Sequence, residues 1–125
     1  MKKTVSISNA PVAAGPYSQA VWSGDFLYCS GQLGLVPESG ALAGPDVTTQ
    51  AIQALKNVLA LLSSQGLTSS DVVKATIFLT DMAGFKEVNE AYGRVFNSDP
   101  PARTCVEVSS LPLGGLVEIE IIARK

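Results

Sequence analysis

Residues 101–120, "PARTCVEVSSLPLGGLVEIE", contain two segments with the alternation of polar and apolar side chains that is typical of β-strands. The first runs from Ala102 to Val108 and the second from Leu116 to Arg124, with a connection between them that contains proline and glycine. Successive side chains of a strand point to opposite faces of its sheet. Each segment therefore presents one face that carries charges and one face of β-branched side chains.

The segments before this stretch predict a strand and a helix. Residues 71–80, "DVVKATIFLT", alternate as a strand. Asp81 can then open a helix with an apolar stripe, and the prolines of "NSDPP", residues 97–101, end it. The predicted inner face of the strand consists of Val73, Ala75, Ile77 and Leu79, and the stripe of the helix consists of Phe85, Val88, Tyr92 and Val95.

The N-terminal half predicts three strands and a longer helix. Thr4–Ser8 alternate as a first strand, and a hairpin is centred on Ser23–Asp25. Asp46 can cap a helix that Gly66 ends. The order β-β-β-α-β-α-β-β predicts a single α+β domain over residues 1–125, with one six-stranded mixed sheet and both helices on one face.

The composition predicts that the other sheet face is also covered. Hydrophobic residues make up 46% of the chain and charged residues 16%, against a usual share of about 25% charged. A small monomer cannot easily bury so many apolar side chains. We therefore expect a closed symmetric oligomer of this chain.

Charge and hydropathy exclude several classes of partner. The formal net charge is −2, and no cationic run exceeds Lys2-Lys3, which argues against nucleic acid as the main partner. Prolines and polar residues interrupt the longest uncharged stretch, residues 4–24, so no membrane span is expected. With no signal-peptide pattern at the N-terminus, we expect a cytoplasmic protein.

The absence of histidine narrows the chemistry. Ser-His-Asp and Cys-His pairs cannot be built within one chain, and a zinc site would need an unusual set of ligands, so no metal is expected. No phosphate-binding glycine loop is present, so no nucleotide cofactor is expected. Cys29 and Cys105 are expected to be thiols, with Cys29 buried as a small apolar side chain.

A carboxylate and a guanidinium remain as candidate functional groups. Arg103 follows Pro-Pro-Ala in extended backbone, and its planar donors suit a bidentate carboxylate. Arg103 and Glu107 share one face of their strand, as Glu118 and Glu120 do in the next, so we expect them to meet on one polar strip. A structural ion pair is the alternative interpretation of this pattern.

Four motifs together resemble the RidA (YjgF) family of reactive-intermediate deaminases: "GPYSQAV", "CSGQLGL", "FKEVNEAYGRVF" and "PARTCVEVSSLPLGGLVEIE". They follow the order of that family across nearly the whole chain. The resemblance implies a chorismate-mutase-like fold and a homotrimer with its sites between subunits. It also implies hydrolysis of 2-imino acids, released by pyridoxal-phosphate enzymes, to 2-keto acids and ammonia, with no cofactor.

The same resemblance assigns roles to residues of this chain. Arg103 would bind the substrate carboxylate, and Glu118, rather than Glu120, would position the attacking water. The backbone N–H groups of Gly31 and Cys105 would assist binding. The remaining pocket positions, contributed across a subunit boundary, match Tyr17, Ser30 and Asn89.

Two other functions stay open at this point. Relatives of this family were first named for RNA cleavage or inhibition of translation, although an acidic chain without histidine is poorly suited to metal-free RNA cleavage. A trimer that binds small carboxylates without catalysis is the third possibility. In that case Arg103 would bind the ligand and Glu118 would activate nothing.

Overall fold

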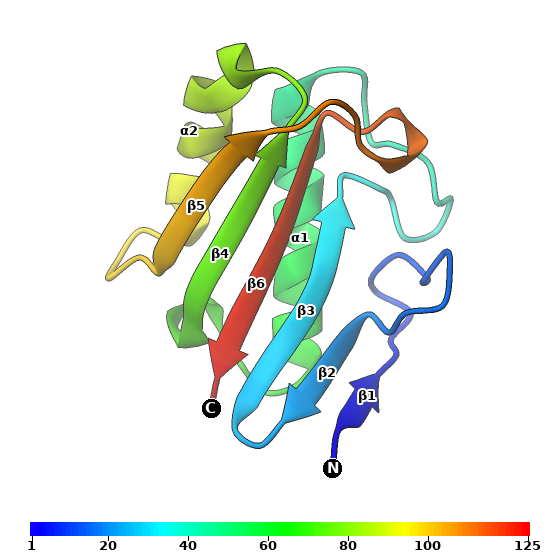
Figure 1. Cartoon of the computed structure of the whole chain (residues 1–125), viewed down its shortest axis with the longest axis vertical. Helices are drawn as coiled ribbons and strands as arrows, with labels where there is room; N and C mark the ends of the chain where they lie inside the picture. Colours follow the sequence, from blue (N-terminus) through cyan, green and yellow to red (C-terminus); the bar gives the residue numbers. More distant parts are fainter.

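The computed structural model covers residues 1–125 and shows one mixed sheet backed by two helices (Figure 1). The spatial order of the strands is β1-β2-β3-β6-β4-β5. All neighbours are antiparallel except β4 and β5, which are parallel. The elements are β1 (Lys3–Val5), β2 (Ala20–Ser23), β3 (Phe26–Leu33), α1 (Val47–Ser64), β4 (Val72–Leu79), α2 (Phe85–Val95), β5 (Ala102–Glu107) and β6 (Val117–Arg124).

The predicted signals at the ends of α1 are confirmed. The Asp46 carboxylate accepts a hydrogen bond of 2.9 Å from the backbone N–H of Thr49, which satisfies a free donor of the first turn. Gly66 follows the helix with a φ of 74°, a left-handed conformation that suits glycine. The β2–β3 hairpin is also confirmed, with Gly24 at a φ of 58° in its turn.

Two of the predicted elements have bounds that differ from the prediction. The first strand ends at Val5, because the backbone N–H of Ile7 donates to the Gln19 side chain and not to a neighbouring strand. Asp81 does not open α2 directly. Its carboxylate accepts from the backbone N–H of Ala83 and caps a short 3₁₀ turn, Met82–Gly84, after which α2 begins.

The inner face of β4 was predicted correctly except at its start. Ala75, Ile77 and Leu79 are buried, but Val73 is 44% exposed and Val72 is buried in its place. The register between β4 and β6 shifts between Val72 and Lys74. This irregularity reverses the alternation for the first residues of the strand.

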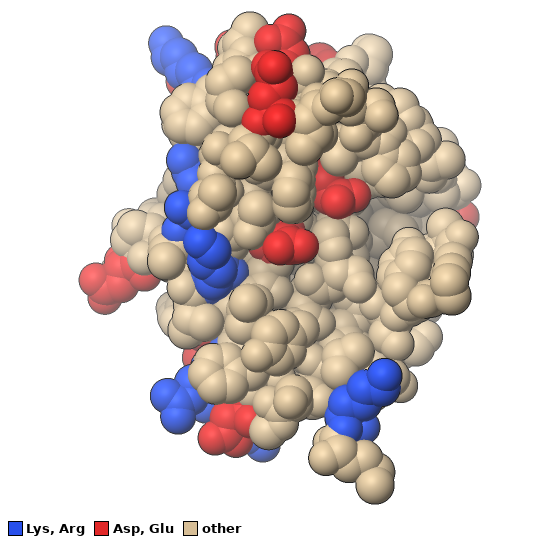
Figure 2. Space-filling view, in the orientation of Figure 1, with Lys and Arg blue, Asp and Glu red and all other residues tan.

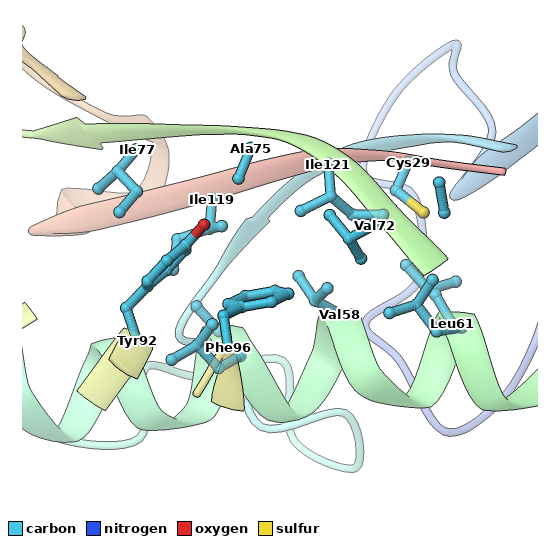
Figure 3. Packing of buried hydrophobic residues seen from close by; sticks show 14 of the residues in the cluster. Cys29, Val58, Leu61, Val72, Ala75, Ile77, Tyr92, Phe96, Ile119 and Ile121 are labelled. Atoms are coloured by element: carbon cyan, nitrogen blue, oxygen red, sulfur yellow. The ribbon is translucent and has the colours of Figure 1, made fainter. Parts of the chain in front are cut away.

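The hydrophobic core lies between the helices and one face of the sheet (Figure 3). Val58 and Leu61 of α1 pack toward Ile119 and Ile121 of β6. Tyr92 and Phe96, at the end of α2, have ring centroids 4.5 Å apart. The two helices therefore cover the same sheet face, as predicted.

The opposite sheet face is bare. Figure 2 views the molecule from this side and shows a surface that is largely uncharged, with a few acidic side chains near its middle. Large exposed side chains on it include Phe26, Tyr28 and Val106. The open face thus combines apolar surface with the carboxylates of β6.

Candidate functional site

Glu118 lies on the open face against the backbone of β3. In the β3–β6 pair the register shifts between Cys29 and Gln32, which gives β3 a bulge that contains Gly31. A Cβ atom on Gly31 would lie 2.6 Å from Glu118 Oε1, a separation that real Cβ atoms do not tolerate. Glycine at this position therefore allows the carboxylate to approach the β3 backbone.

A pocket of about 240 Å³ opens beside this contact. Tyr17, Gly31 and Glu118 all line it, so three of the predicted site residues lie together. We call these three residues the carboxylate half of the site. The other lining residues are Pro11, Val12, Ala14, Gln19, Gln32, Leu33, Leu35, Pro112 and Leu113.

Gln19, which the sequence analysis did not single out, holds the loop that forms this pocket. Its buried amide accepts from the backbone N–H of Ile7 at 2.6 Å and donates to the carbonyls of Ile7, Ala10 and Pro11. In the same loop, the Tyr17 hydroxyl accepts a 3.1 Å hydrogen bond from the backbone N–H of Ala14. A single buried glutamine in a polar run carries no sequence signal of such a role.

Ser30 fastens the same loop to β3. Its hydroxyl donates to the Ser18 carbonyl at 2.6 Å, and its backbone N–H donates to the Gln19 carbonyl at 2.9 Å. Within the single chain, the Ser30 hydroxyl proton is thus used to hold the backbone that precedes β2. The contact of Ser30 with a substrate stays a prediction.

Glu118 has an unusual electrostatic environment. Partial burial of its carboxyl raises its pKa above the ordinary value, and the negative charge of Glu120 on the same strand face raises it further. A carboxylate with a raised pKa is a stronger proton acceptor near neutral pH than an ordinary glutamate. The carboxylate half thus contains a group suited to accepting a proton from water.

A second group of predicted residues lies at the other edge of the sheet. In the parallel pairing of β5 with β4, Arg103 stands opposite Ala75 and Cys105 opposite Ile77, so both face the helices. The guanidinium carbon of Arg103 lies 4.9 Å from the ring centroid of Tyr92 and 5.7 Å from that of Phe85, both on α2.

Asn89 lies on the same stripe of α2 as these rings, and its buried Oδ1 has no hydrogen-bond partner. Burial raises the pKa of the Cys105 thiol, and the positive charge of Arg103 opposes this shift, so the thiol is not activated as a nucleophile. We call Asn89, Arg103 and Cys105 the guanidinium half of the site.

The expectation of one polar strip is wrong within a single chain. Glu118 pairs with Phe78 and Glu120 with Thr76, on the open face, whereas Arg103 pairs with Ala75 on the helix-covered face. Each strand alternates as predicted, but β4 lies between β5 and β6 and its pairings set their relative phase. The guanidinium and the carboxylate therefore lie on opposite faces of the sheet.

Glu107, the other acid of the quoted stretch, has a structural contact. Its Oε1 accepts a 2.7 Å hydrogen bond from the backbone N–H of Met82, at the turn that leads into α2. The carboxylate satisfies a donor at the start of a helical segment. Glu107 thereby fixes the entry of α2, which carries the rings that contact Arg103.

The amino-acid sequence matches a family model described as endoribonuclease L-PSP over residues 7–125. It is also 46% identical over 123 residues to a 2-iminobutanoate/2-iminopropanoate deaminase of Bos taurus, with 98% of this chain and 90% of the bovine protein covered. The chain belongs to the RidA (YjgF) family.

Solved structures of RidA-family proteins have the same fold. The YyfA protein of Yersinia pestis, described as a protein of unknown function of the conserved Rid family, superposes with a TM-score of 0.97 at 44% identity, covering 100% of both chains. Escherichia coli TdcF with bound serine superposes with a TM-score of 0.94 at 38% identity, covering 98% of both. The predicted RidA-like α+β fold is confirmed.

This RidA-family chain has no candidate metal cluster and no candidate membrane-spanning helix. No three His, Cys, Asp or Glu side chains gather in a way that could hold a metal ion. Neither helix combines the length and the apolar character needed to cross a bilayer.

Proposed function

We propose that the protein hydrolyses 2-imino acids to 2-keto acids and ammonia, in sites that form between neighbouring copies of a homotrimer. The main support for this proposal is that the two halves of the site lie on opposite faces of the sheet. The carboxylate half opens on one sheet face and the guanidinium half lies on the other, at an edge strand. A ligand that needs both must bind where one copy meets another.

The bare sheet face supports the association of copies. It exposes Phe26, Tyr28 and Val106, and burial of apolar surface is the main favourable contribution to most protein–protein association. We propose that the open faces pack toward one another in the trimer, so that Glu118 of one copy approaches the β5 edge of the next. Names of relatives also support the activity: the bovine protein is named for imino acids, and TdcF holds serine.

The proposed reaction needs orientation and one proton acceptor. Arg103 binds the substrate carboxylate through two in-plane N–H donors, and the backbone N–H groups of Gly31 and Cys105 assist it. Water adds to the C=N carbon while Glu118 accepts a proton from it, and the electron pair of the C=N bond moves to nitrogen. With a protonated imine this addition gives a neutral amine, to which Glu118 returns the proton. The C–N bond then breaks and ammonia leaves, while Glu118 takes the proton of the new hydroxyl group and the C=O bond forms.

Complementation between two variants tests this proposal. We expect Arg103→Ala and Glu118→Gln each to lose about 10²-fold or more of the rate of keto-acid formation in a coupled threonine dehydratase assay. Mixed trimers, made by refolding the two variants together, should regain roughly a quarter of wild-type activity, because one interface in four pairs an intact Arg103 with an intact Glu118.

The controls decide between a shared site and a site within one chain. Each variant refolded alone should stay inactive. A protein that carries both Arg103→Ala and Glu118→Gln is mixed with wild type as a second control. This mixture should be no more active than the same amount of wild-type protein alone. Mixed trimers that remain as inactive as the separate variants would contradict the intersubunit site, and full activity of Arg103→Ala would contradict the function itself.

RNA cleavage is a second candidate, because the matching family model is described as an endoribonuclease. The chain has a net charge of −2 and the two halves offer one guanidinium, so few contacts to phosphates are available. We expect no cleavage of single-stranded RNA above that of the Arg103→Ala variant. Cleavage by wild type that Arg103→Ala abolishes would instead favour this candidate.

Binding without catalysis is separated from hydrolysis by Glu118→Gln. The amide keeps the size of the carboxyl but cannot accept a proton from water. We expect this variant to bind 2-oxobutanoate with nearly wild-type affinity while its turnover falls. Unchanged turnover would assign water activation to another group.

A further inference from the structure

Two aromatic side chains of α2 lie against the guanidinium of Arg103, although no role in the site was predicted for either. Phe85 and Tyr92 are seven positions apart, which places them on the same face of the helix. Both ring centroids lie within 6 Å of the guanidinium carbon, the range of a cation–π interaction. Arg103 therefore has aromatic neighbours on its own chain.

Packing alone accounts for one of these rings but not for the other. Tyr92 is 5% exposed and belongs to the hydrophobic core (Figure 3). Phe85, in contrast, keeps 38% of its surface exposed, so it contributes little to the core. Its position beside Arg103 is the feature that distinguishes it from an ordinary surface residue.

The chemistry of guanidinium explains what the rings achieve. The faces of the guanidinium plane are weakly hydrated and stack on aromatic rings, while its N–H donors all lie in the plane. Rings against a face therefore leave the donors free for a carboxylate. They also restrict a long side chain that would otherwise lose rotamer freedom when a ligand binds.

We propose that Phe85 and Tyr92 are positioning residues that hold the Arg103 guanidinium with its in-plane donors directed toward a ligand carboxylate. This inference rests on the proposed function, because it assigns the carboxylate to Arg103. It adds that the affinity for the ligand depends on α2 as well as on β5. The rings act on binding through Arg103 and touch no reacting atom.

The contact can be measured without any ligand. The chain has three arginines, so protein labelled with ¹⁵N-arginine gives three side-chain Nε–H signals. Ring currents should displace the Arg103 signal, and Phe85→Leu should move it toward the position of an arginine without aromatic neighbours. Arg124, 5.5 Å from the ring centroid of Phe26, is a matched reference that should not move.

The consequence for binding is measured on the same variants. We expect Phe85→Leu to raise the Kd of 2-oxobutanoate and the KM of the imino acid by about threefold to tenfold, with kcat changed less than about twofold. Phe85→Tyr keeps a ring and should restore both constants. Ile52→Ala, which alters an α1 side chain that is also 38% exposed, should leave them unchanged.

The possible failures are distinguishable. An Arg103 signal that does not respond to Phe85→Leu, or equal losses of affinity in Phe85→Leu and Phe85→Tyr, would overturn the positioning role. If wild type binds no 2-oxobutanoate and forms no keto acid, the proposed function is wrong, and so is the claim that the rings direct Arg103 toward a ligand carboxylate. The NMR shift would still show whether the rings contact Arg103. Circular dichroism and gel filtration of each variant confirm that fold and assembly are retained.

Discussion

The carboxylate half and the guanidinium half of the site are built in different ways. Glu118 lies in a pocket that already has its shape, formed by a bulged strand, a glycine and a loop held by Gln19. Arg103 lies at an edge strand, with aromatic neighbours and with the unpartnered Oδ1 of Asn89 on the adjacent helix. The carboxylate half is therefore fully formed within one chain, whereas the guanidinium half contains a buried oxygen, Asn89 Oδ1, that has no hydrogen-bond donor. This difference agrees with the proposal that the guanidinium half lies at the contact with a neighbouring copy.

Gly31→Ala is expected to have the largest effect on activity, because it directly alters the carboxylate half. The added Cβ would lie 2.6 Å from Glu118 Oε1, so the carboxylate must move away from the β3 backbone. A displacement of about 1 Å in a catalytic group can cost about 10²-fold in rate. We expect a loss of that order in kcat for imine hydrolysis, measured with the coupled assay.

Gly93→Ala is the matched control for this change. Gly93 lies in α2 and has no atom within 4 Å of an added Cβ, so alanine there should keep full activity and favour the helix. If Gly31→Ala also keeps wild-type kcat, then the position of Glu118 against β3 is not needed for catalysis. The proposed role of the carboxylate half would then be wrong.

Gln19→Leu is expected to have the next largest effect and tests what preserves the pocket. The substitution removes four hydrogen bonds to the backbone of residues 7–11 and leaves buried backbone groups without partners. At about 1 kcal/mol for each hydrogen bond, the free energy of unfolding should fall by about 2–4 kcal/mol. Urea denaturation followed by circular dichroism measures this loss.

The part of the chain that loses protection in Gln19→Leu shows whether Gln19 stabilises the pocket or the whole fold. If Gln19 mainly preserves the pocket, hydrogen exchange of residues 7–18 should increase more than that of α2. An equal increase throughout the chain would show that Gln19 stabilises the whole fold and has no special relation to the carboxylate half.

The two halves also differ in how far the sequence predicts them. Alternation along each strand correctly placed Arg103 with Glu107 and Glu118 with Glu120. It could not predict that the two pairs occupy opposite faces, because relative phase depends on which strand lies between them and on its register. The caps at Asp46 and Gly66 were predictable because they depend on a few neighbouring residues.

Long-range contacts escaped prediction for the same physical reason. Gln19 meets the backbone of residues 7–11 only after the chain has turned back, and glutamine in a loop has no characteristic spacing. Phe85 was predicted as part of the stripe of α2, but its contact with Arg103 depends on the parallel pairing of β5 with β4. Sequence patterns identify the faces of elements, and packing decides which faces meet.

Tyr92→Phe makes a smaller change next to the guanidinium half. The Tyr92 hydroxyl is buried without a hydrogen-bond partner, and burial raises the pKa of this phenol, which stays neutral. Removing an unpaired buried hydroxyl while keeping the ring should increase the free energy of unfolding by about 1 kcal/mol. The affinity for 2-oxobutanoate should not change, since the ring beside Arg103 remains. A loss of stability would show that the hydroxyl has a partner in the assembled protein.

Glu120→Gln should produce the smallest effect, a shift in the pH dependence of turnover. Glu118 must be ionised to accept a proton, so activity falls as the pH drops through its pKa, which burial and the Glu120 charge raise. Removing that charge lowers the pKa of Glu118, and the acidic limb of kcat against pH should move to lower pH. Burial, which is the larger cause of the raised pKa, remains in this variant. The acidic limb should therefore still lie at a higher pH than the pKa of an ordinary glutamate would give.

The folding equilibrium provides an independent check on the same pKa. A carboxyl whose pKa is higher in the folded than in the unfolded state makes the protein less stable as the pH rises between the two values. Glu120→Gln brings the two values closer, so this fall in the free energy of unfolding should become smaller. Glu38→Gln removes an equal charge from an exposed loop and is the matched control. If both variants change the acidic limb and the stability equally, the effect comes from net charge, and Glu118 is not the group that limits turnover at low pH.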